Sequence, residues 1–406
     1  MTKIRRKKIN PLRVISLIFT FIIIIIISIV NISKKTNNKP TTYNASILAV
    51  GDIMAHQDQL DAQYDPSTDS YSFDNNFKHV KKYIENADYS IANLETTLAG
   101  NKDRPYSAYP LFNSPDELAD ALKNAGFDLI STINNHSFDM GSLGVNRTLS
   151  LLKKKGFDTV GTRENSSDDD YIIKNINNIN LGITSYSFGE VQDNTKSLNG
   201  IQVSNDCKDK MNIFDYRDVD SAFETIYSTV KKMSNSDLQI VIIHWGNEYK
   251  RSESNFQKEL AQKLCDVGVD IIIGSHPHVV QPMETITSSN GDNETVVIYS
   301  LGNYISNQSR ENVGIYSEDG LMVNIDITKS IESNEVKIEK VTCIPTWVNK
   351  YSKNNKYHYE IIPIEDKDTL DNISNLNKSK IKQSYENTSL LIDSSDLINI
   401  VQSPFN

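Results

Sequence analysis

The sequence predicts an α/β fold, with one folded domain that follows an apolar segment near the amino terminus. Beyond residue 44, short apolar runs alternate with stretches of helical periodicity, which is typical of α/β domains. Several of these runs end at a residue that can bind a metal. The length of 406 residues, of which 38% are hydrophobic and 23% charged, suits one large domain or one domain with an added lobe.

The first 44 residues predict a membrane anchor. Residues 1–13 carry six basic side chains, and residues 14–32 contain no charge. A spanning helix needs roughly 20 apolar residues, and preceding basic residues keep the amino terminus cytoplasmic. We therefore expect a basic cytoplasmic tail (1–13), a transmembrane helix (14–32), a polar linker (33–44) and a domain outside the cell membrane.

Two alternatives for the apolar segment remain, a cleaved signal peptide and a buried core helix. A signal peptide has an apolar region of about 7–15 residues followed by a small-residue cleavage site. The run in this chain is longer, and residues 28–33 offer no good pair of small residues. The single-pass anchor is therefore the prediction that we follow.

The composition excludes one class of partner and leaves the cysteines without an assigned role. Asp and Glu (52) outnumber Lys and Arg (42), which gives a formal charge of −10. An acidic surface argues against nucleic acid as a partner, whereas a bound metal can still attract an anionic substrate. The three cysteines, Cys207, Cys265 and Cys343, match no metal-binding spacing and form no disulfide framework.

Short apolar runs predict the strands of the domain. They lie at 47–50, 89–92, 127–133, 181–186, 239–243, 269–273 and 296–300. Period-two alternation at 321–327 and 336–343 predicts antiparallel strands near the edge of a sheet.

Three helices are predicted between these strands. The first is capped by Ser114 and stopped by Gly126, the second ends at Gly156, and the third spans 256–267. Residues 45–350 form the predicted main domain. In the extension 351–406, the polar stretch from about 366 indicates one or two amphipathic helices or a loosely ordered tail.

Polar residues follow five of the predicted strands. They are Asp52, Glu95, Asn135 with His136, His244, and His276 with His278. Because open α/β sheets bind ligands at the carboxyl ends of strands, we expect these side chains to meet at one edge. Two carboxylates, an amide and four imidazoles suit one or two divalent ions of Mn, Fe, Zn or Co, with a carboxylate shared between two ions.

The distribution of histidine supports this metal site. Four of the seven histidines fall at these strand ends, and His56 lies four residues after Asp52. Only His79 and His358 lie elsewhere. A single histidine would be interpreted as a core or surface residue, but the concentration of the set favours metal binding.

Five motifs resemble those of the CapA family of poly-γ-glutamate capsule biosynthesis proteins, within the calcineurin-like metallophosphoesterase superfamily. They are Gly51-Asp52-Ile53-Met54, Asn93-Leu94-Glu95, Asn134-Asn135-His136-Ser137-Phe138-Asp139-Met140-Gly141, His244-Trp245-Gly246-Asn247-Glu248-Tyr249 and Gly274-Ser275-His276-Pro277-His278. The resemblance runs from about Ser46 to Tyr304. It implies a four-layer α/β/β/α sandwich of two mixed sheets.

The resemblance also implies roles for single residues. Asp52 and His278 would bind a first metal, and Glu95 would bridge two metals. Asn135, His244 and His276 would bind the second metal.

His136 would then be a general acid, oriented by Asp139 three residues later, because a carboxylate holds an imidazole in one tautomer.

Two departures from the superfamily pattern argue against ordinary phosphoesterase activity. The superfamily opens with Asp-x-His, but Met54 stands in the place of that histidine. His56, two residues further along, is a candidate replacement ligand. Glu95 stands where the superfamily usually has an aspartate.

Candidate substrate-binding residues are Arg104, Trp245 and Tyr249. For Arg104 the alternative is a solvated loop charge, and for the two aromatic residues it is core packing. The resemblance implies an anionic envelope polymer as the substrate and other capsule synthesis subunits as partners.

Two functions follow from this reading. One is a metal-dependent hydrolase, and the other is a non-catalytic, polymer-binding subunit of a capsule synthesis and export complex. A surface nucleotidase is disfavoured, because nothing in the sequence resembles a nucleoside-binding carboxy-terminal domain.

Overall fold

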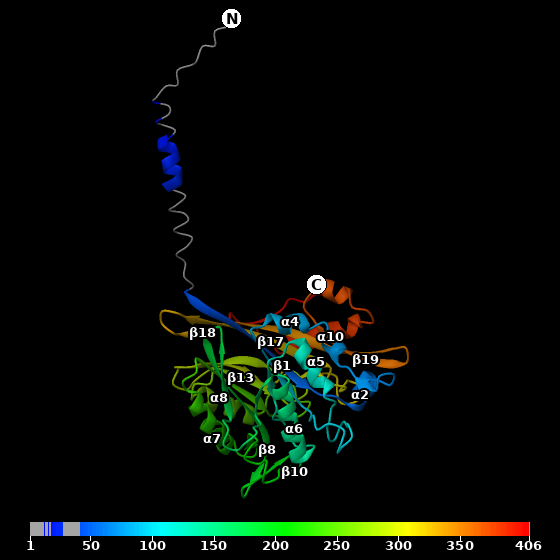
Figure 1. Cartoon of the computed structure of the whole chain (residues 1–406). Coiled ribbons are helices and arrows are strands. Elements are labelled where there is room, and N and C mark those ends of the chain that lie inside the picture. The colour runs from blue at the N-terminus through cyan, green and yellow to red at the C-terminus, as the bar shows by residue number, and fades with distance from the viewer. Residues whose placement is uncertain (1–11, 13–14, 16–17, 27–40, 406) are drawn as a thin grey trace.

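Two mixed sheets form the centre of the folded chain, as the sequence predicts. The structure is a computed structural model that describes residues 12, 15, 18–26 and 41–405 (Figure 1). Each large sheet has nine strands. A separate hairpin joins β2 (Tyr64–Asp65) to β3 (Ser70–Tyr71).

The first sheet combines a parallel half with an antiparallel half. Its strand order is β19 (Lys356–Pro363), β18 (Val336–Lys353), β17 (Asp319–Ser330), β1 (Thr42–Ile53), β4 (Tyr89–Leu94), β5 (Leu129–Ser131) and β6 (Asp158–Val160), with β16 (Asn303–Ile305) paired to β1 and β20 (Ile398–Ile400) paired to β18. Strands β1, β4, β5 and β6 are parallel, so their carboxyl ends lie at the same edge.

The second sheet has a parallel centre. Its order is β10 (Ile201–Gln202), β9 (Thr195–Leu198), β8 (Ile179–Gln192), β12 (Leu238–His244), β13 (Ile271–Ser275), β15 (Glu294–Ile298) and β14 (Met283–Thr287), with β7 (Tyr171–Ile176) and β11 (Ile213–Asp215) also paired to β8. Strands β8, β12, β13 and β15 run parallel.

Helices cover the outer face of each sheet. On the first sheet lie α2 (Gln57–Gln63), α3 (Asp74–Phe77), α4 (Lys81–Asn86), α5 (Glu117–Ala125) and α6 (Gly141–Lys154), and on the second lie α7 (Val219–Val230), the 3-10 turn η1 (Lys231–Met233) and α8 (Asn255–Cys265). The two groups of helices occupy separate sides of the molecule (Figure 1). The layers are therefore helix, sheet, sheet and helix.

Strand β1 shows why its residues form a strand that is buried on both faces. Ile47 and Ala49 join the core between the sheets, whereas Leu48 and Val50 join the core beneath the first group of helices. Successive side chains of a strand point to opposite faces, so a continuous apolar run fills both cores.

The predicted start of the first helix was wrong. Helix α5 begins at Glu117 with Asp116 at its N-cap, and its end at Gly126 agrees with the prediction. The Ser114 hydroxyl instead makes a 2.8 Å hydrogen bond to the Thr96 hydroxyl. A tertiary partner has replaced the local cap.

The carboxy-terminal residues pack onto the first sheet. The boundary predicted at residue 350 falls inside β18, which pairs with β19. The polar stretch beyond contains α9 (Lys367–Asp371) and α10 (Lys378–Ser389).

The predicted tail (1–13), anchor (14–32) and linker (33–44) lie mostly outside the described residues. Residues 18–26 are helical. In the described ranges of the chain, the search for a helix of membrane-spanning length and hydropathy finds none.

Candidate metal centre

The carboxyl ends of five strands carry the predicted ligands to one buried site. From the first sheet come Asp52 at the end of β1, Glu95 after β4 and Asn135 after β5. From the second come His244 at the end of β12, and His276 and His278 after β13. All six side chains are at most 5% exposed.

Two glycines let the strand ends approach neighbouring backbone. A Cβ added to Gly51 would lie 1.9 Å from the Gly302 carbonyl oxygen, and one added to Gly274 would lie 2.1 Å from that of Tyr299. Only glycine fits such approaches without displacing the backbone. Close backbone packing therefore requires glycine at position 51, directly before Asp52, and at position 274, two residues before His276.

Backbone strain is concentrated at this site. His276 (φ 101°), His278 (φ 56°) and Tyr249 (φ 61°) adopt positive φ. In the described part of the chain, every other non-glycine residue with positive φ is Asn or Asp, which tolerate that region. Strained conformations of this kind persist where function requires them.

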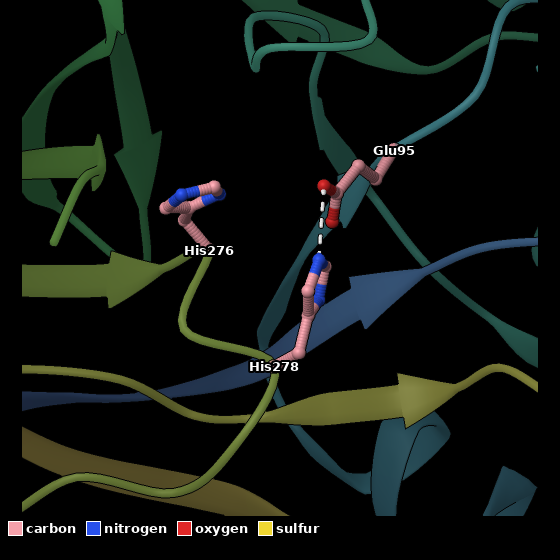
Figure 2. Close-up of side chains that lie close together, drawn as sticks. All are labelled: Glu95, His276 and His278. Atoms are coloured by element: carbon pink, nitrogen blue, oxygen red, sulfur yellow. Dashed lines mark ion pairs between the residues drawn. The ribbon is translucent and has the colours of Figure 1, made fainter. Parts of the chain in front are cut away.

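Two groups of potential metal ligands share the Glu95 carboxylate. One contains Glu95, His276 and His278, and the other contains Asp52, Glu95 and His244, with the ligand atoms of each group within 4.8 Å of one another. Figure 2 shows Glu95 facing both His276 and His278, with its ion pair to His278 drawn. This arrangement fits a carboxylate shared between two ions.

The donor set fits a divalent cation, because buried donor atoms lack partners. Neither Glu95 carboxylate oxygen has a hydrogen-bond partner among the described residues, and the same holds for Nδ1 of His276. Glu95 Oε1 lies 3.4 Å from His244 Nε2 and 3.8 Å from His278 Nε2. An unpaired buried carboxylate is costly, whereas a carboxylate among imidazoles is a common ligand set for such ions.

Three residues that the sequence analysis did not select hold the ligands in place. Asn93 Nδ2 donates to Asp52 Oδ1 at 2.7 Å, and Asn303 Oδ1 lies 3.0 Å from His278 Nδ1. The Ser275 hydroxyl lies 2.9 Å from His244 Nδ1. Such partners fix the ring orientation of metal-binding histidines.

Asn93 and Ser275 belong to the same motifs as the predicted ligands Glu95 and His276, which was an available signal. Asn135 lies in the ligand set through its amide oxygen, 3.0 Å from His244 Nε2.

Charge and burial act against each other at this site. Burial lowers the pKa of His278, but the Glu95 and Asp52 charges outweigh it and raise that pKa to about 9. Burial raises the pKa of Asp52, yet His278 and His244 bring it below its ordinary value. Burial, with His244 and His278 nearby, lowers the pKa of His276. A histidine must be neutral to bind a metal, so ion binding would release the His278 proton.

His136 and Asp139 form a separate buried pair beside Asn135. His136 Nδ1 lies 2.8 Å from Asp139 Oδ2, which also accepts the Phe112 backbone N–H at 2.7 Å. The Phe112 ring lies edge-on to the imidazole, with centroids 4.7 Å apart. The carboxylate favours the Nδ1–H tautomer and leaves Nε2 for proton transfer.

The Trp245 side chain adopts the alternative, core packing. Its indole is fully buried, donates from Nε1 to the Tyr299 carbonyl oxygen at 2.9 Å and belongs to the core beneath α7 and α8.

Tyr249 and Arg104 differ in their relation to the site. The Tyr249 ring lies 6.0 Å from that of His278, and its hydroxyl accepts from Gln308 Nε2 at 3.2 Å. Arg104 is exposed on a loop, where it makes no hydrogen bond or ion pair with the described residues.

His56 does not join the ligand groups found in the described residues. Its Nδ1 accepts the Asn307 backbone N–H at 3.3 Å and its backbone N–H donates to the Gln59 side chain at the start of α2. Burial lowers its pKa to about 4. Met54 is buried in the position of the missing superfamily histidine.

Comparisons with known proteins identify relatives of this chain. Residues 46–308 match the family described as bacterial capsule synthesis protein PGA_cap, and the match includes every candidate ligand. The capsule biosynthesis protein CapA of Bacillus anthracis is 28% identical over 316 residues, which cover 75% of this chain and 71% of that protein. The PGA biosynthesis protein CapA of Bacillus subtilis (strain 168) is 28% identical over 317 residues, 76% of each chain.

Solved structures of phosphoesterases are similar at a lower level. The calcineurin-like phosphoesterase YfkN from Bacillus subtilis has 17% identity and a TM-score of 0.40, and covers 86% of this chain and 98% of its own. A phosphatase from Mycoplasma pneumoniae has 15% identity and a TM-score of 0.42, with 74% and 93% covered.

Proposed function

Because this chain belongs to the bacterial capsule synthesis protein family PGA_cap, we propose that it is a metal-dependent hydrolase or transferase of capsule biosynthesis. Its substrate is poly-γ-glutamate or a related anionic envelope polymer. The observation that carries the proposal is the buried Glu95 carboxylate, which has no hydrogen-bond partner among the described residues and faces three histidines.

Six side chains would hold one or two divalent ions of Mn, Fe, Zn or Co. They are Asp52, Glu95, Asn135, His244, His276 and His278. Such an ion supplies a Lewis acid for a carbonyl or phosphoryl oxygen and makes water a better nucleophile at neutral pH.

His136 supplies the proton that the leaving group needs. Asp139 accepts from Nδ1–H, so the protonated imidazolium would give up its other proton from Nε2. The Phe112 N–H holds the Asp139 carboxylate in turn. Both side chains are at most 5% exposed, so little bulk water reaches the pair.

The proposed location is the cell membrane, with the folded domain outside. The basic residues 1–13 and the uncharged residues 14–32 support a single-pass anchor. The full-length chain should stay in the membrane pellet after alkaline extraction, whereas a chain that lacks residues 1–44 should be found in the supernatant.

The decisive experiment measures cleavage by the full-length chain in the presence of Mn. The substrates are γ-glutamate oligomers and a model phosphodiester. Glu95→Gln keeps the size of the side chain but removes its charge, and it should abolish turnover and metal binding. A chain that turns over neither substrate with any of the four metals, yet still binds polymer, would instead be the non-catalytic subunit. Turnover that survives chelation or His244→Ala would disprove the metal-dependent mechanism.

A further inference from the structure

A cleft of about 340 Å³ opens directly beside the metal centre. Asn135 and His276 belong both to its wall and to the candidate ligand set. A substrate whose reacting group lies at the ligands of Figure 2 would therefore extend into this cleft.

Aromatic rings continue the imidazole wall outward. The Phe188 ring, on β8, lies 4.5 Å from His276 and stacks parallel to His244 at 6.2 Å. Tyr216, just after β11, meets Phe188 edge-on at 6.1 Å and is 47% exposed. Phe256, at the start of α8, also lines the cleft.

Amides and one carboxylate surround these rings. Asn199 comes from the turn between β9 and β10, and Asn247 and Glu248 from the loop after β12. All three are exposed. Glu248 is the only acidic side chain among the lining residues, and no described lysine or arginine lines the cleft.

This lining is unsuited to a polyanion. A carboxylate brought beside Glu248 meets like charge in a partly enclosed space, with no basic residue to offset it. An ammonium group could use Glu248, the rings and the amide oxygens, but it would leave the amide N–H donors without an acceptor. An uncharged ring with an apolar face and polar edges matches both the aromatic side chains of the cleft and the polar side chains around them.

We propose that this cleft binds an uncharged sugar ring of an envelope glycan, which is joined to the capsule polymer or accepts it at the metal centre. The proposal rests on the proposed function of that centre and names its second substrate class. The C–H face of the sugar packs on Phe188 and Tyr216, and its hydroxyls bond to Asn199, Asn247 and Glu248. The anionic chain lies toward the metal ligands.

Calorimetry with the full-length chain tests the proposal without any need for turnover. The probes are an uncharged trimer of N-acetylglucosamine, a γ-glutamate trimer and a lysine trimer. The sugar trimer should bind, and Tyr216→Ala or Asn247→Ala should weaken its binding tenfold or more. Tyr357→Ala is the matched control, because Tyr357 is also 47% exposed but lies on β19 of the other sheet. It should leave binding unchanged.

Glu95→Gln separates this proposal from the proposed function. That variant should lose turnover and metal yet bind the sugar trimer as the unchanged chain does. If the unchanged chain shows no turnover but still binds the sugar trimer through Tyr216, sugar binding in the cleft is supported and only the proposed enzymatic activity is contradicted. The cleft proposal is overturned if the sugar trimer fails to bind, if Tyr216→Ala binds it equally well, or if either charged trimer displaces it.

Discussion

His136 differs from the other histidines of the metal centre in its partner. It is paired with Asp139, whereas His244, His276 and His278 lie within reach of Glu95. In the described residues it belongs to neither group of ligand atoms. Its imidazole is therefore placed apart from the candidate metal ligands.

A general-acid role predicts that the effect of His136→Ala depends on the leaving group. For a poor leaving group, loss of the acid should lower kcat about 10²–10⁴-fold. For p-nitrophenolate, which departs without a proton, the loss should be much smaller. Steady-state rates with two phosphodiesters that differ only in the leaving group measure this. His358→Ala, on β19, serves as the control. Equal losses with both substrates would assign His136 a structural role.

Asp319 predicts a pH-dependent stability. It is 2% exposed, and burial, against a hydrogen bond from Asn387, raises its pKa to about 6. The folded state thus holds its proton more tightly than the unfolded state, so stability is lost as the pH rises from about 4 through 6.

Asp319→Asn should therefore be more stable than the unchanged chain by about 1–3 kcal/mol at pH 8, with no gain at pH 4. Urea unfolding at the two pH values measures the difference. The exposed Asp393→Asn should show none. A gain for Asp319→Asn that is the same at both pH values would contradict the titration.

For single residues, the sequence predicted those candidate ligands that residue type and position at a strand end are enough to identify. Asp52, Glu95 and His244 stand at strand ends, where their types suggest ligands. The supporting role of Asn303 depends on a contact 25 residues away along the chain, which spacing does not reveal. For Trp245 the sequence left two alternatives open, because a residue next to a ligand can point into either the cleft or the core.

Among the elements, β1 places the most constraints on the site. Its Asp52 backbone N–H donates to the Gly302 carbonyl oxygen at 3.0 Å, and β16 pairs with it there. Gly51 permits this approach because it has no Cβ.

Gly51→Ala should therefore destabilise the chain by about 3 kcal/mol and abolish metal binding, because the new methyl group displaces the Gly302 carbonyl. Gly291→Ala is the matched control. It has positive φ but open space around its Cβ, so it should cost only about 1 kcal/mol of backbone strain. Thermal unfolding and metal titration measure both variants, and a Gly51→Ala chain that binds metal normally would contradict this account.

The elements show where pattern reasoning succeeds and where it fails. The antiparallel strands expected at 321–327 and 336–343 are β17 and β18, but neither is an edge strand, because β17 lies between β1 and β18, and β18 also pairs with β19. The polar stretch after residue 366 was ambiguous, since α10 is held by tertiary contacts. One is a hydrogen bond from Asn387 Nδ2 to Asp319 Oδ2 at 2.9 Å. Propensity alone does not specify such a helix.

In the whole molecule, the metal centre lies between the two sheets. Asp52, Glu95 and Asn135 belong to the first sheet, and the three histidines to the second. Other polar contacts among the described residues also join the sheets. The Ser131 and Ser185 hydroxyls lie 2.8 Å apart, and Lys329 Nζ lies 2.8 Å from Asp237 Oδ2.

An ion held by ligands from both sheets should act as a cross-link. Chelation should therefore lower the melting temperature, and added metal at about 1,000 times its Kd should restore about 4 kcal/mol. Glu95→Gln removes the charge that the ion would neutralise, so its melting temperature should not respond to metal.

Asp237→Asn is the control for inter-sheet contacts in general. It weakens the Lys329 ion pair while leaving the ligands intact, so the chain should lose some stability yet keep the full response to metal. Calorimetric unfolding across a metal titration measures all three chains. If Glu95→Gln responded to metal as the unchanged chain does, the ion would bind elsewhere, and Glu95 could not be the carboxylate that joins the two sheets through the metal.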